Sequence, residues 1–290
     1  MPTFDTPEPI AVVLELGVGD VHIAASDRAD TTVDVRPSDP GRKADVAAAE
    51  QTRVEYADGV LRVKAPKGWR RYTSRSGRES VDVRIEVPAG STLRGDAALV
   101  ALRSTGRLGD CRYSTGAGDI QIEEAGALRL RSAAGDVAVG RAAGHCDVST
   151  ASGAIRLGTV DGTLVVKNAN GDTGIGDVSG DVRVSAANGR ITVGRAARTV
   201  ALKTAYGDIR LGEVGPGAVS AQTAFGKIDV GVRDGVAAWL DLQTALGRVD
   251  NGLDAAGRPG PGEDVVEIKA RTAYGDVTVR RSVAEPAAQA

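Results

Sequence analysis

The stretch TAYGDIRLG at residues 204–212 returns almost unchanged as TAYGDVTVR at residues 272–280. Shorter versions of the same pattern recur along the chain at intervals of about 18 residues, each built around a glycine. This anchor glycine is found at Gly118, Gly135, Gly153, Gly171, Gly189, Gly207, Gly226, Gly247 and Gly275. Spacing this regular predicts one structural unit that is repeated many times.

Apolar residues occupy four columns around the anchor glycine, two and four positions after it and five and seven positions before it. Around Gly189 these columns hold Ile191, Val193, Val184 and Val182. The positions between the columns are mostly polar or charged, which is the alternation expected of a half-buried strand. Each unit therefore predicts two short strands that meet at a glycine corner.

One such unit cannot bury its apolar face alone, whereas stacked units can. The sequence predicts an all-β protein, a parallel β-solenoid with coils of about 18 residues spaced about 4.8 Å apart. Right-handed winding is expected because parallel crossovers are overwhelmingly right-handed. We assign the solenoid repeats to residues 93–281, a β-rich N-terminal cap with one short helix (41–51) to residues 1–92, and a disordered tail to residues 282–290.

The cap is expected because an open coil edge invites pairing with other chains. Within it, the segment 53–64 predicts a hairpin, since the Asp58-Gly59 pair favours a tight turn between two strands. An insertion follows near the other end, where NGLDAAGRPGPGED (251–264) separates the last two coils. Its glycine and proline content forbids a regular strand, so an exposed loop is predicted there.

The spaced TAxGDI units, the preceding VPAGS (87–91) and the β-rich start resemble a bacterial family of β-strand-repeat domains. That family carries the label "putative adhesin" and is a domain of unknown function. The resemblance covers roughly residues 10–280 and implies the architecture derived above. It carries over no catalytic residues, because the family has none that are agreed.

Composition narrows the class of protein. The formal net charge is -2, which gives no strong nucleic-acid signal. The N-terminus lacks a basic segment followed by an apolar one, and no stretch is long and apolar enough for a membrane span, so we expect a cytoplasmic protein. Cys111 and Cys146 share one inward column but lie two coils apart, beyond the reach of a disulfide. Buried free thiols are therefore predicted.

Metal and enzyme chemistry are not favoured by the sequence. Glycine-aspartate corners suggest calcium-binding β-rolls, yet the column after the anchor mixes acids and bases. Its run Asp172–Arg190–Asp208–Lys227 instead predicts an exposed ladder of ion pairs. The histidines, His22 and His145, have no neighbouring motif for a nucleophile or a metal. We therefore expect no enzyme activity, no cofactor and no metal site.

Two features depart from the repeated pattern and are candidate partner-binding sites. The first is the loop KAPKGWRRYTSRSGR (64–78), where basic residues surround two aromatic ones, with Trp69, Arg70, Arg71 and Tyr72 at its centre. The second is the column just before the anchor glycine, which changes from small and polar residues to Tyr206, Phe225, Leu246 and Tyr274. Asn170 and Asn188 in the same column indicate an exposed turn, so the later side chains should also lie near the surface.

These observations favour a non-enzymatic binding or scaffold protein, with a protein as its partner, that is a monomer or a weak homo-oligomer. A cytoskeletal filament former similar to bactofilins is the first alternative, because its coils have a similar length. A carbohydrate- or cell-surface-binding adhesin is the second alternative, which the family label implies. The sequence alone does not choose between the basic loop and the aromatic column as the contact surface.

Overall fold

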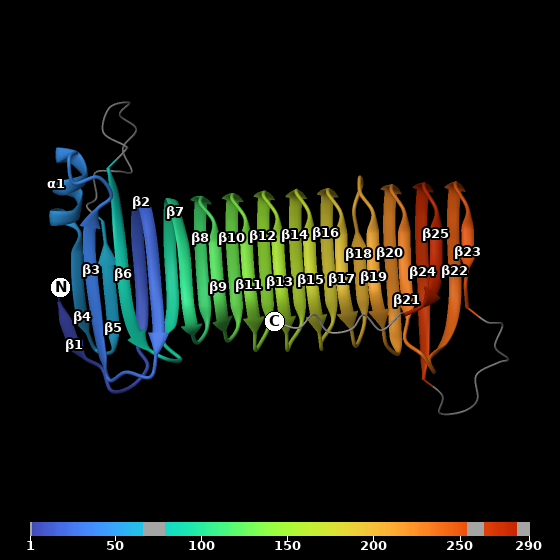
Figure 1. The fold of residues 1–290 in the computed structure, drawn as a ribbon, viewed down its shortest axis with the longest axis horizontal. Coiled ribbons are helices and arrows are strands. Elements are labelled where there is room, and N and C mark those ends of the chain that lie inside the picture. The colour runs from blue at the N-terminus through green and yellow to red at the C-terminus, as the bar shows by residue number, and fades with distance from the viewer. Residues whose placement is uncertain (1, 66–78, 254–263, 283–290) are drawn as a thin grey trace. The chain divides into compact units, whose positions relative to one another are not determined.

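The computed structural model describes residues 2–65, 79–253 and 264–282, and the chain divides into two compact units, Met1–Gly153 and Ala154–Ala290. Both units consist almost wholly of β-strands (Figure 1). Among the described residues the only helix is α1 (Lys43–Gln51), which lies inside the segment predicted to be helical. The loop centred on Trp69 lies outside the described residues, as do most of the insertion and of the C-terminal tail.

Unit 1 contains α1 and the first twelve strands. The strands are β1 (Thr3–Asp5), β2 (Ala11–Ser26), β3 (Asp30–Pro37), β4 (Arg53–Ala57), β5 (Val60–Lys64), β6 (Ser80–Pro88), β7 (Thr92–Arg107), β8 (Cys111–Ala117), β9 (Ile120–Ala125), β10 (Leu128–Ala134), β11 (Val137–Ala142) and β12 (Cys146–Ser152).

The long strands β2 and β7 pair in parallel along almost their whole length, from Ala11 beside Thr92 to Ala24 beside Thr105. The first part of β2 also pairs with β5 and the second part with β6. The first part of β7 continues to β8 and the second part to β9. Each long strand therefore serves two sheets and spans one coil, so β2 and β7 form two successive coils.

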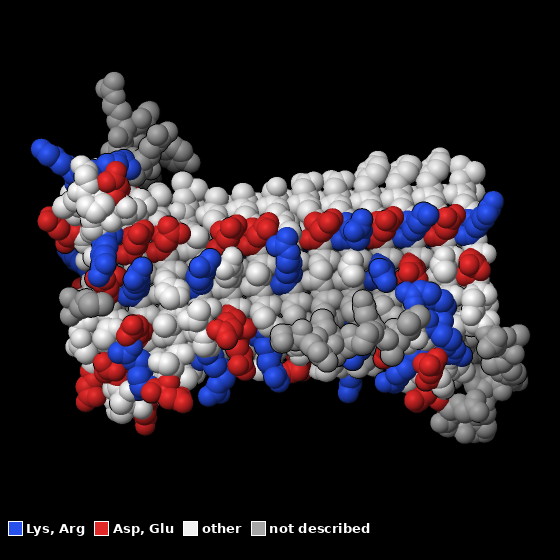
Figure 2. Space-filling model, viewed as in Figure 1, with Lys and Arg blue, Asp and Glu red and all other residues white. Residues whose placement is uncertain are grey.

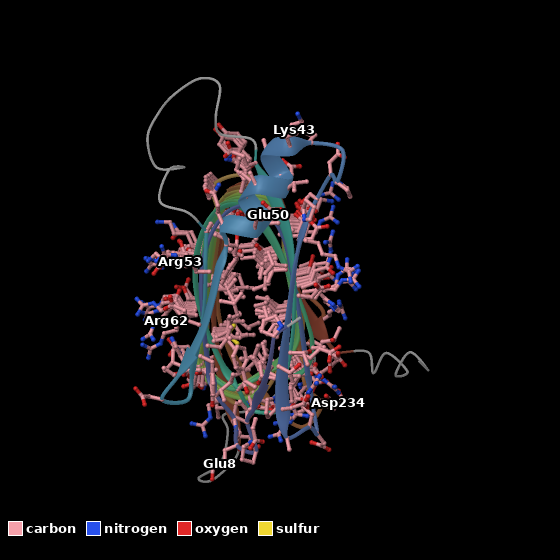
Figure 3. All side chains as sticks on the ribbon, turned by 90° about the vertical axis from the view of Figure 1, so that its left-hand side faces the viewer. Glu8, Lys43, Glu50, Arg53, Arg62 and Asp234 are labelled. Atoms are coloured by element: carbon pink, nitrogen blue, oxygen red, sulfur yellow. The ribbon has the colours of Figure 1, made fainter. Side chains whose placement is uncertain are left out.

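The strands at the N-terminal side of unit 1 pair antiparallel: β4 with β5, and β3 with both β1 and β6. The turn between β4 and β5 has positive φ at Asp58 (51°) and Gly59 (73°), as a tight hairpin turn requires. The predicted hairpin is confirmed. In an end-on view, the charged side chains of Arg53 and Arg62 point away from the interior (Figure 3).

Unit 2 contains the remaining strands. They are β13 (Ile155–Val160), β14 (Leu164–Asn170), β15 (Thr173–Val178), β16 (Val182–Asn188), β17 (Ile191–Ala196), β18 (Val200–Lys203), β19 (Ile209–Val214), β20 (Gly217–Phe225), β21 (Ile228–Val232), β22 (Ala237–Leu246), β23 (Val249–Asn251), β24 (Val265–Tyr274) and β25 (Val277–Arg281). Even-numbered strands pair in parallel with even-numbered ones and odd with odd, which is the pairing of a β-solenoid with two strands per coil. The predicted fold class is confirmed.

The coils at the end of unit 2 do not stack in the order of the sequence. β24 pairs on one side with β20 and on the other with β22, and β25 likewise lies between β21 and β23. The last coil of the chain is therefore inserted between two earlier coils. Even spacing along the sequence does not indicate this insertion, because it shows that a coil exists and not which coil lies beside it.

The four apolar columns form the interior of each unit. Leu130 and Val148 in unit 1, and Val193 and Leu211 in unit 2, have no measurable exposure. Glycine is required at the corner because its backbone has a positive φ and the next coil lies close by. At Gly207 φ is 142°, and a Cβ atom would stand 2.1 Å from the carbonyl oxygen of Gly189.

The two cysteines are buried and free, as predicted. In the strand register, Leu128 of β10 is flanked by Cys111 of β8 and Cys146 of β12, so the thiols lie two coils apart. Burial raises the pKa of both thiols to about 12. At neutral pH these side chains therefore behave as small apolar residues of the core.

Candidate functional site

The aromatic column identified in the sequence forms a continuous surface strip on unit 2. In order through the coils it consists of Tyr206, Phe225, Tyr274 and Leu246, which we call the aromatic stripe. Phe225, Tyr274 and Leu246 are the last residues of β20, β24 and β22, and Tyr206 follows β18. Because β24 lies between β20 and β22, Tyr274 comes next to Phe225 and Leu246 ends the strip.

The three rings of the aromatic stripe stack face to face. The ring centroids of Tyr206 and Phe225 are 4.9 Å apart with planes 3° from parallel, and those of Phe225 and Tyr274 are 4.8 Å apart at 4°. This separation equals the spacing between neighbouring strands, so the backbone itself sets the stack. The rings cover much of each other's faces, and the surface that remains is made chiefly of ring edges.

The stripe is nevertheless well exposed. The exposed fractions are 56% for Tyr206, 43% for Phe225, 49% for Tyr274 and 62% for Leu246. The predicted surface position is therefore confirmed, and the rings additionally support one another. Neighbouring residues of the same column in unit 2 are polar: the Asn188 side-chain amide donates to Asn170 Oδ1 at 2.8 Å.

A row of threonines, buried at Thr223 and Thr272 and half-buried at Thr244, fixes the corner beneath the stripe. Each threonine lies two residues before the stripe residue, and its hydroxyl donates to a corner carbonyl of the neighbouring coil. The acceptor is Gly207 O for Thr223, at 3.0 Å, and Gly226 O for Thr272, also at 3.0 Å. Thr244 donates in the same way to Gly275 O at 2.9 Å. These bonds hold the corner in one conformation, so the stripe side chains project from a rigid base.

An alternating row of charges runs beside the stripe, just past the corner glycine. In order through the coils of unit 2 it reads Asp172, Arg190, Asp208, Lys227, Asp276 and Arg248 (Figure 2). Each aspartate accepts the backbone N–H of the next coil: Asp172 from Arg190 at 2.8 Å, Asp208 from Lys227 at 2.8 Å, and Asp276 from Arg248 at 3.0 Å. The predicted alternation of charge is present and extends by Asp276 and Arg248. An ion pair along this row joins Lys227 to Asp276 at 3.5 Å, whereas the other aspartates contact the backbone of the next coil.

The backbone contact changes the acidity of the last aspartate. Donation from the Arg248 N–H, followed by the nearby charge of Lys227, lowers the pKa of Asp276 below its ordinary value. This aspartate therefore remains ionised over a wider pH range than a free one. A strip of exposed rings bordered by fixed charges combines an apolar contact area with a polar rim.

Sequence reasoning missed one exposed aromatic residue in this unit. Trp239 on β22 is 56% exposed and aligns with Glu267 of β24. A tryptophan at an outward-facing strand position is unusual, and its place in the alternation was the signal that could have found it. The other predicted candidates, Trp69, Arg70, Arg71 and Tyr72, lie outside the described residues.

Among the described residues, no group of three or more His, Cys, Asp or Glu side chains is placed to hold a metal ion. The helix that the structure describes is too short and too polar to cross a membrane.

Comparison with known proteins identifies the family. A family model described as Toastrack DUF4097 matches residues 11–280. No protein of the curated set matches the chain. Similar solved structures include a "putative adhesin" from Bacteroides fragilis, 12% identical with a TM-score of 0.40, where the match covers 96% of this chain and 95% of that one. Another is a "putative cell adhesion protein" from Clostridium sporogenes, 10% identical with a TM-score of 0.25, covering 97% and 98%. The family resemblance seen in the sequence is thereby confirmed, and the chain belongs to the Toastrack DUF4097 family.

Proposed function

We propose that the protein is a non-enzymatic binding and scaffold protein that holds a protein partner on the aromatic stripe of unit 2. The observation that carries the proposal is the exposure of Tyr206, Phe225, Tyr274 and Leu246 in one uninterrupted column. Polar residues would satisfy the fold at these positions, as Asn170 and Asn188 do in the same column. The change to large apolar side chains therefore serves something other than folding.

The geometry of the stripe favours a protein over a sugar. Sugars stack on free aromatic faces, whereas the rings here stack on each other and leave mainly edges. Aromatic side chains that are already immobile lose little entropy when a partner binds, which favours affinity. Interface hot spots are enriched in tyrosine, and a buried anchor contributes about 2 kcal/mol or more to binding. The neighbouring charge row would form the polar rim.

The experiment compares capture by the native chain with capture by a variant that carries Tyr206→Asn and Phe225→Asn. These changes install the residue type of earlier coils, so the fold should tolerate them and the melting temperature should change little. We expect quantitative mass spectrometry of captured proteins to show a specific set that the variant loses. The matched control is Leu99→Asn, which removes an equally exposed side chain (51%) from the corner of β7 in unit 1.

Retention of every captured protein by the folded double variant would overturn the proposal. Loss with the Leu99→Asn control as well would show that general surface hydrophobicity, and not the stripe, causes capture. A direct measurement with the purified partner then replaces capture: its dissociation constant should rise by about tenfold or more in the double variant.

One observation favours a second candidate function, a filament former similar to bactofilins. Among the described residues, β22 pairs with β24 along one side and with no strand along the other. An unpaired strand edge is a template for joining another chain. Negative-stain microscopy of the purified protein separates the two functions, because single short rods agree with the scaffold and long filaments agree with the second candidate.

A further inference from the structure

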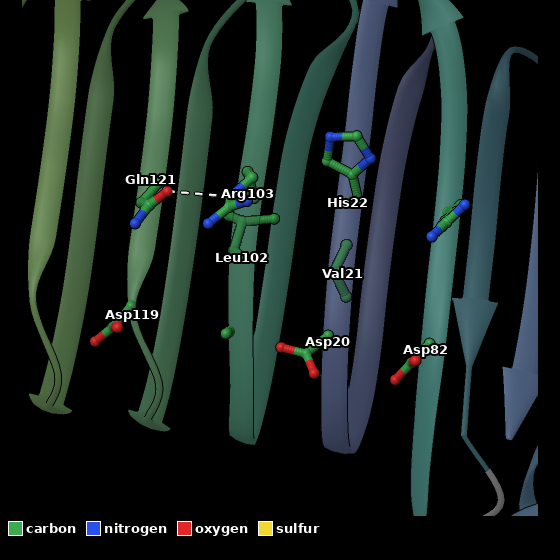
Figure 4. Close-up of a pocket in the computed structure, with 10 residues that line it drawn as sticks. Asp20, Val21, His22, Asp82, Leu102, Arg103, Asp119 and Gln121 are labelled. Carbon is green, nitrogen blue, oxygen red and sulfur yellow. Dashed lines mark hydrogen bonds between the residues drawn. The ribbon is translucent and has the colours of Figure 1, made fainter. Parts of the chain in front are cut away.

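A second surface feature lies on unit 1, on the outer face of the sheet formed by β6, β2, β7 and β9. It is a hollow of about 590 Å³, within the range of small-molecule sites. The residues that line it are Asp20, Val21, His22, Asp82, Arg84, Ala101, Leu102, Arg103, Asp119 and Gln121 (Figure 4). Val21 and Leu102 turn their side chains into the core, so their backbone contributes to the floor, and the charged side chains of the outer face form the walls.

The strand register sorts the charged residues into two rows that cross the strands. The first row is acidic: Asp82 aligns with Asp20, Asp20 with Ala101, and the next strand adds Asp119. The second row carries the bases Arg84 and Arg103 on either side of a histidine: Arg84 aligns with His22, and His22 with Arg103. Figure 4 shows Asp82, Asp20 and Asp119 along one level and His22, Arg103 and Gln121 along another. The hollow arises at Ala101, whose small side chain interrupts the acidic row.

This arrangement reverses the rule followed in unit 2. There, neighbouring coils carry opposite charges, as in the run from Asp172 to Arg248. At the hollow, Asp82 and Asp20 lie directly opposite on neighbouring strands, and each row carries one sign of charge, which is unfavourable for the sheet. A complementary ligand would offset that repulsion.

Within the part of the chain that the structure describes, no ion pair engages the charged side chains of the hollow, although Asp82 accepts the Ser38 hydroxyl at 2.5 Å and Asp119 accepts the Asp136 N–H at 2.9 Å. Among the described residues, Arg84 and Arg103 form no ion pair, and Arg103 Nε donates to the neutral Gln121 at 3.1 Å. Two acids outside the acidic row, one aligned with Arg84 and one on its own strand, are already engaged. Asp34, which aligns with Arg84, forms an ion pair with Arg36 at 2.6 Å, and Glu86 forms one with Arg28.

We propose that the hollow binds a small organic zwitterion. Its anionic group lies over the row of Arg84, His22 and Arg103, and its cationic group lies over the row of Asp82, Asp20 and Asp119. The two rows are two residues apart along each strand, a distance of about 7 Å. A ligand whose opposite charges are separated by a comparable length meets both rows at once. This site is independent of the aromatic stripe, which belongs to the other unit.

A series of ω-amino acids measures the spacing directly. Isothermal titration calorimetry at low ionic strength, where charge interactions are least screened, would compare glycine, 4-aminobutanoate, 5-aminopentanoate and 8-aminooctanoate. We expect the affinity to be highest for 5-aminopentanoate, which spans the two rows when extended. Pentanoate and pentylamine each carry only one of its charges, so each should bind at least about tenfold more weakly than 5-aminopentanoate.

Two variants test which row holds which charged group of the ligand. Arg84→Gln should weaken 5-aminopentanoate and pentanoate but leave pentylamine unchanged, and Asp20→Asn should weaken 5-aminopentanoate and pentylamine but leave pentanoate unchanged. The control is Arg210→Gln, because Arg210 occupies the corresponding strand position of unit 2. No saturable binding of any member of the series would overturn the proposal. Equal binding of all lengths, or equal loss in the control, would do the same, since either shows attraction to surface charge only.

Discussion

The ammonium group of Lys227 lies 3.5 Å from the carboxylate of Asp276, although a complete coil of sequence separates the two residues. In the sequence, the charges past the corner run Lys227, Arg248, Asp276, which places two bases side by side. Insertion of β24 and β25 between earlier coils brings Asp276 between the two bases and restores alternation. The same insertion gives the stacked rings of Phe225 and Tyr274. The insertion of this one coil therefore completes both the alternating row of charges and the aromatic stripe.

The coil order can be tested with engineered disulfides. Lys227→Cys with Asp276→Cys places two thiols on neighbouring parallel strands, about 4.8 Å apart between Cα atoms, within disulfide range. Lys227→Cys with Arg248→Cys places them two coils apart, about 10 Å, beyond that range. We expect only the first pair to oxidise, as peptide mapping would show. Formation of the second bridge alone would mean that the coils follow chain order.

Asp276 should contribute to stability in a pH-dependent way. Its pKa is lowered in the folded state, chiefly because its carboxylate accepts the Arg248 N–H. A carboxyl of this kind stabilises the fold above its unfolded pKa, near pH 4, and the contribution is lost as pH falls through the lower folded pKa. Asp276→Asn should therefore lower the melting temperature at pH 7 and have little effect at pH 2. The comparison is a pair of thermal melts at each pH.

A result in which Asp276→Asn is equally destabilising at both pH values would show that loss of the carboxylate charge is not the cause. Asp250→Asn is a suitable control, since Asp250 lies on β23 of the neighbouring coil and aligns with Thr278. Its substitution should leave the difference in melting temperature between pH 7 and pH 2 the same as in the native protein.

The corner glycines should tolerate no side chain. Gly207→Ala combines a φ of 142° with a Cβ atom 2.1 Å from the Gly189 oxygen. We expect a loss of about 3 kcal/mol or more in the free energy of unfolding, measured by denaturant titration. Gly174→Ala is the matched control, because Gly174 lies in β15 with its nearest contact, Ile155 O, at 4.0 Å. A fold that tolerates both changes equally would contradict the close approach of the coils.

The cysteines provide a test of the core. With burial raising the pKa of Cys111 and Cys146 to about 12, the reactive thiolate is scarce and inaccessible at pH 8. A thiol reagent should label neither residue in the native protein and both in denaturant. Rapid labelling without denaturant would place at least one thiol at the surface. Separate Cys111→Ala and Cys146→Ala variants would then show which of the two it is.

The sequence predicts the columns well because each column records one physical requirement. An inward position must be apolar, a corner needs glycine, and these demands repeat in every coil, as Leu130, Val148 and Gly207 illustrate. The columns do not predict which coil lies beside which, since β24 would fit beside β20 or β22 with the same apolar columns. Only the charged residue that follows the corner glycine distinguishes one order of the coils from the other.

The candidate sites were predictable to different degrees. The aromatic stripe shows in the sequence because Tyr206 and Phe225 replace asparagine in a column that the turn chemistry exposes. The hollow does not show, because its acidic and basic rows join residues such as Asp20 and Asp119 that only the strand pairing brings together. Its central residue, Ala101, becomes meaningful only beside the larger side chains of the same row.

The packing of Tyr113 against Gly95 gives the last prediction. Tyr113 is an aromatic residue in a core column of aliphatic ones, 1% exposed, and its hydroxyl donates to Val100 O at 3.3 Å. A Cβ atom on Gly95 would lie 2.7 Å from the Tyr113 ring and 3.3 Å from Leu14 Cβ. The ring therefore occupies the space that any side chain at Gly95 would fill. Gly95→Ala should cost about 1–3 kcal/mol by overpacking.

Tyr113→Leu should also destabilise the protein, because it leaves part of the ring's volume empty. The two changes compensate in space, since the added methyl group enters the volume that the ring vacates. The double variant should therefore be more stable than the sum of the single losses predicts, with a coupling of about 0.5–3 kcal/mol in denaturant unfolding. Strict additivity would show that Gly95 is required for its backbone and not for the ring, and the coupling measurement distinguishes these causes where either single variant cannot.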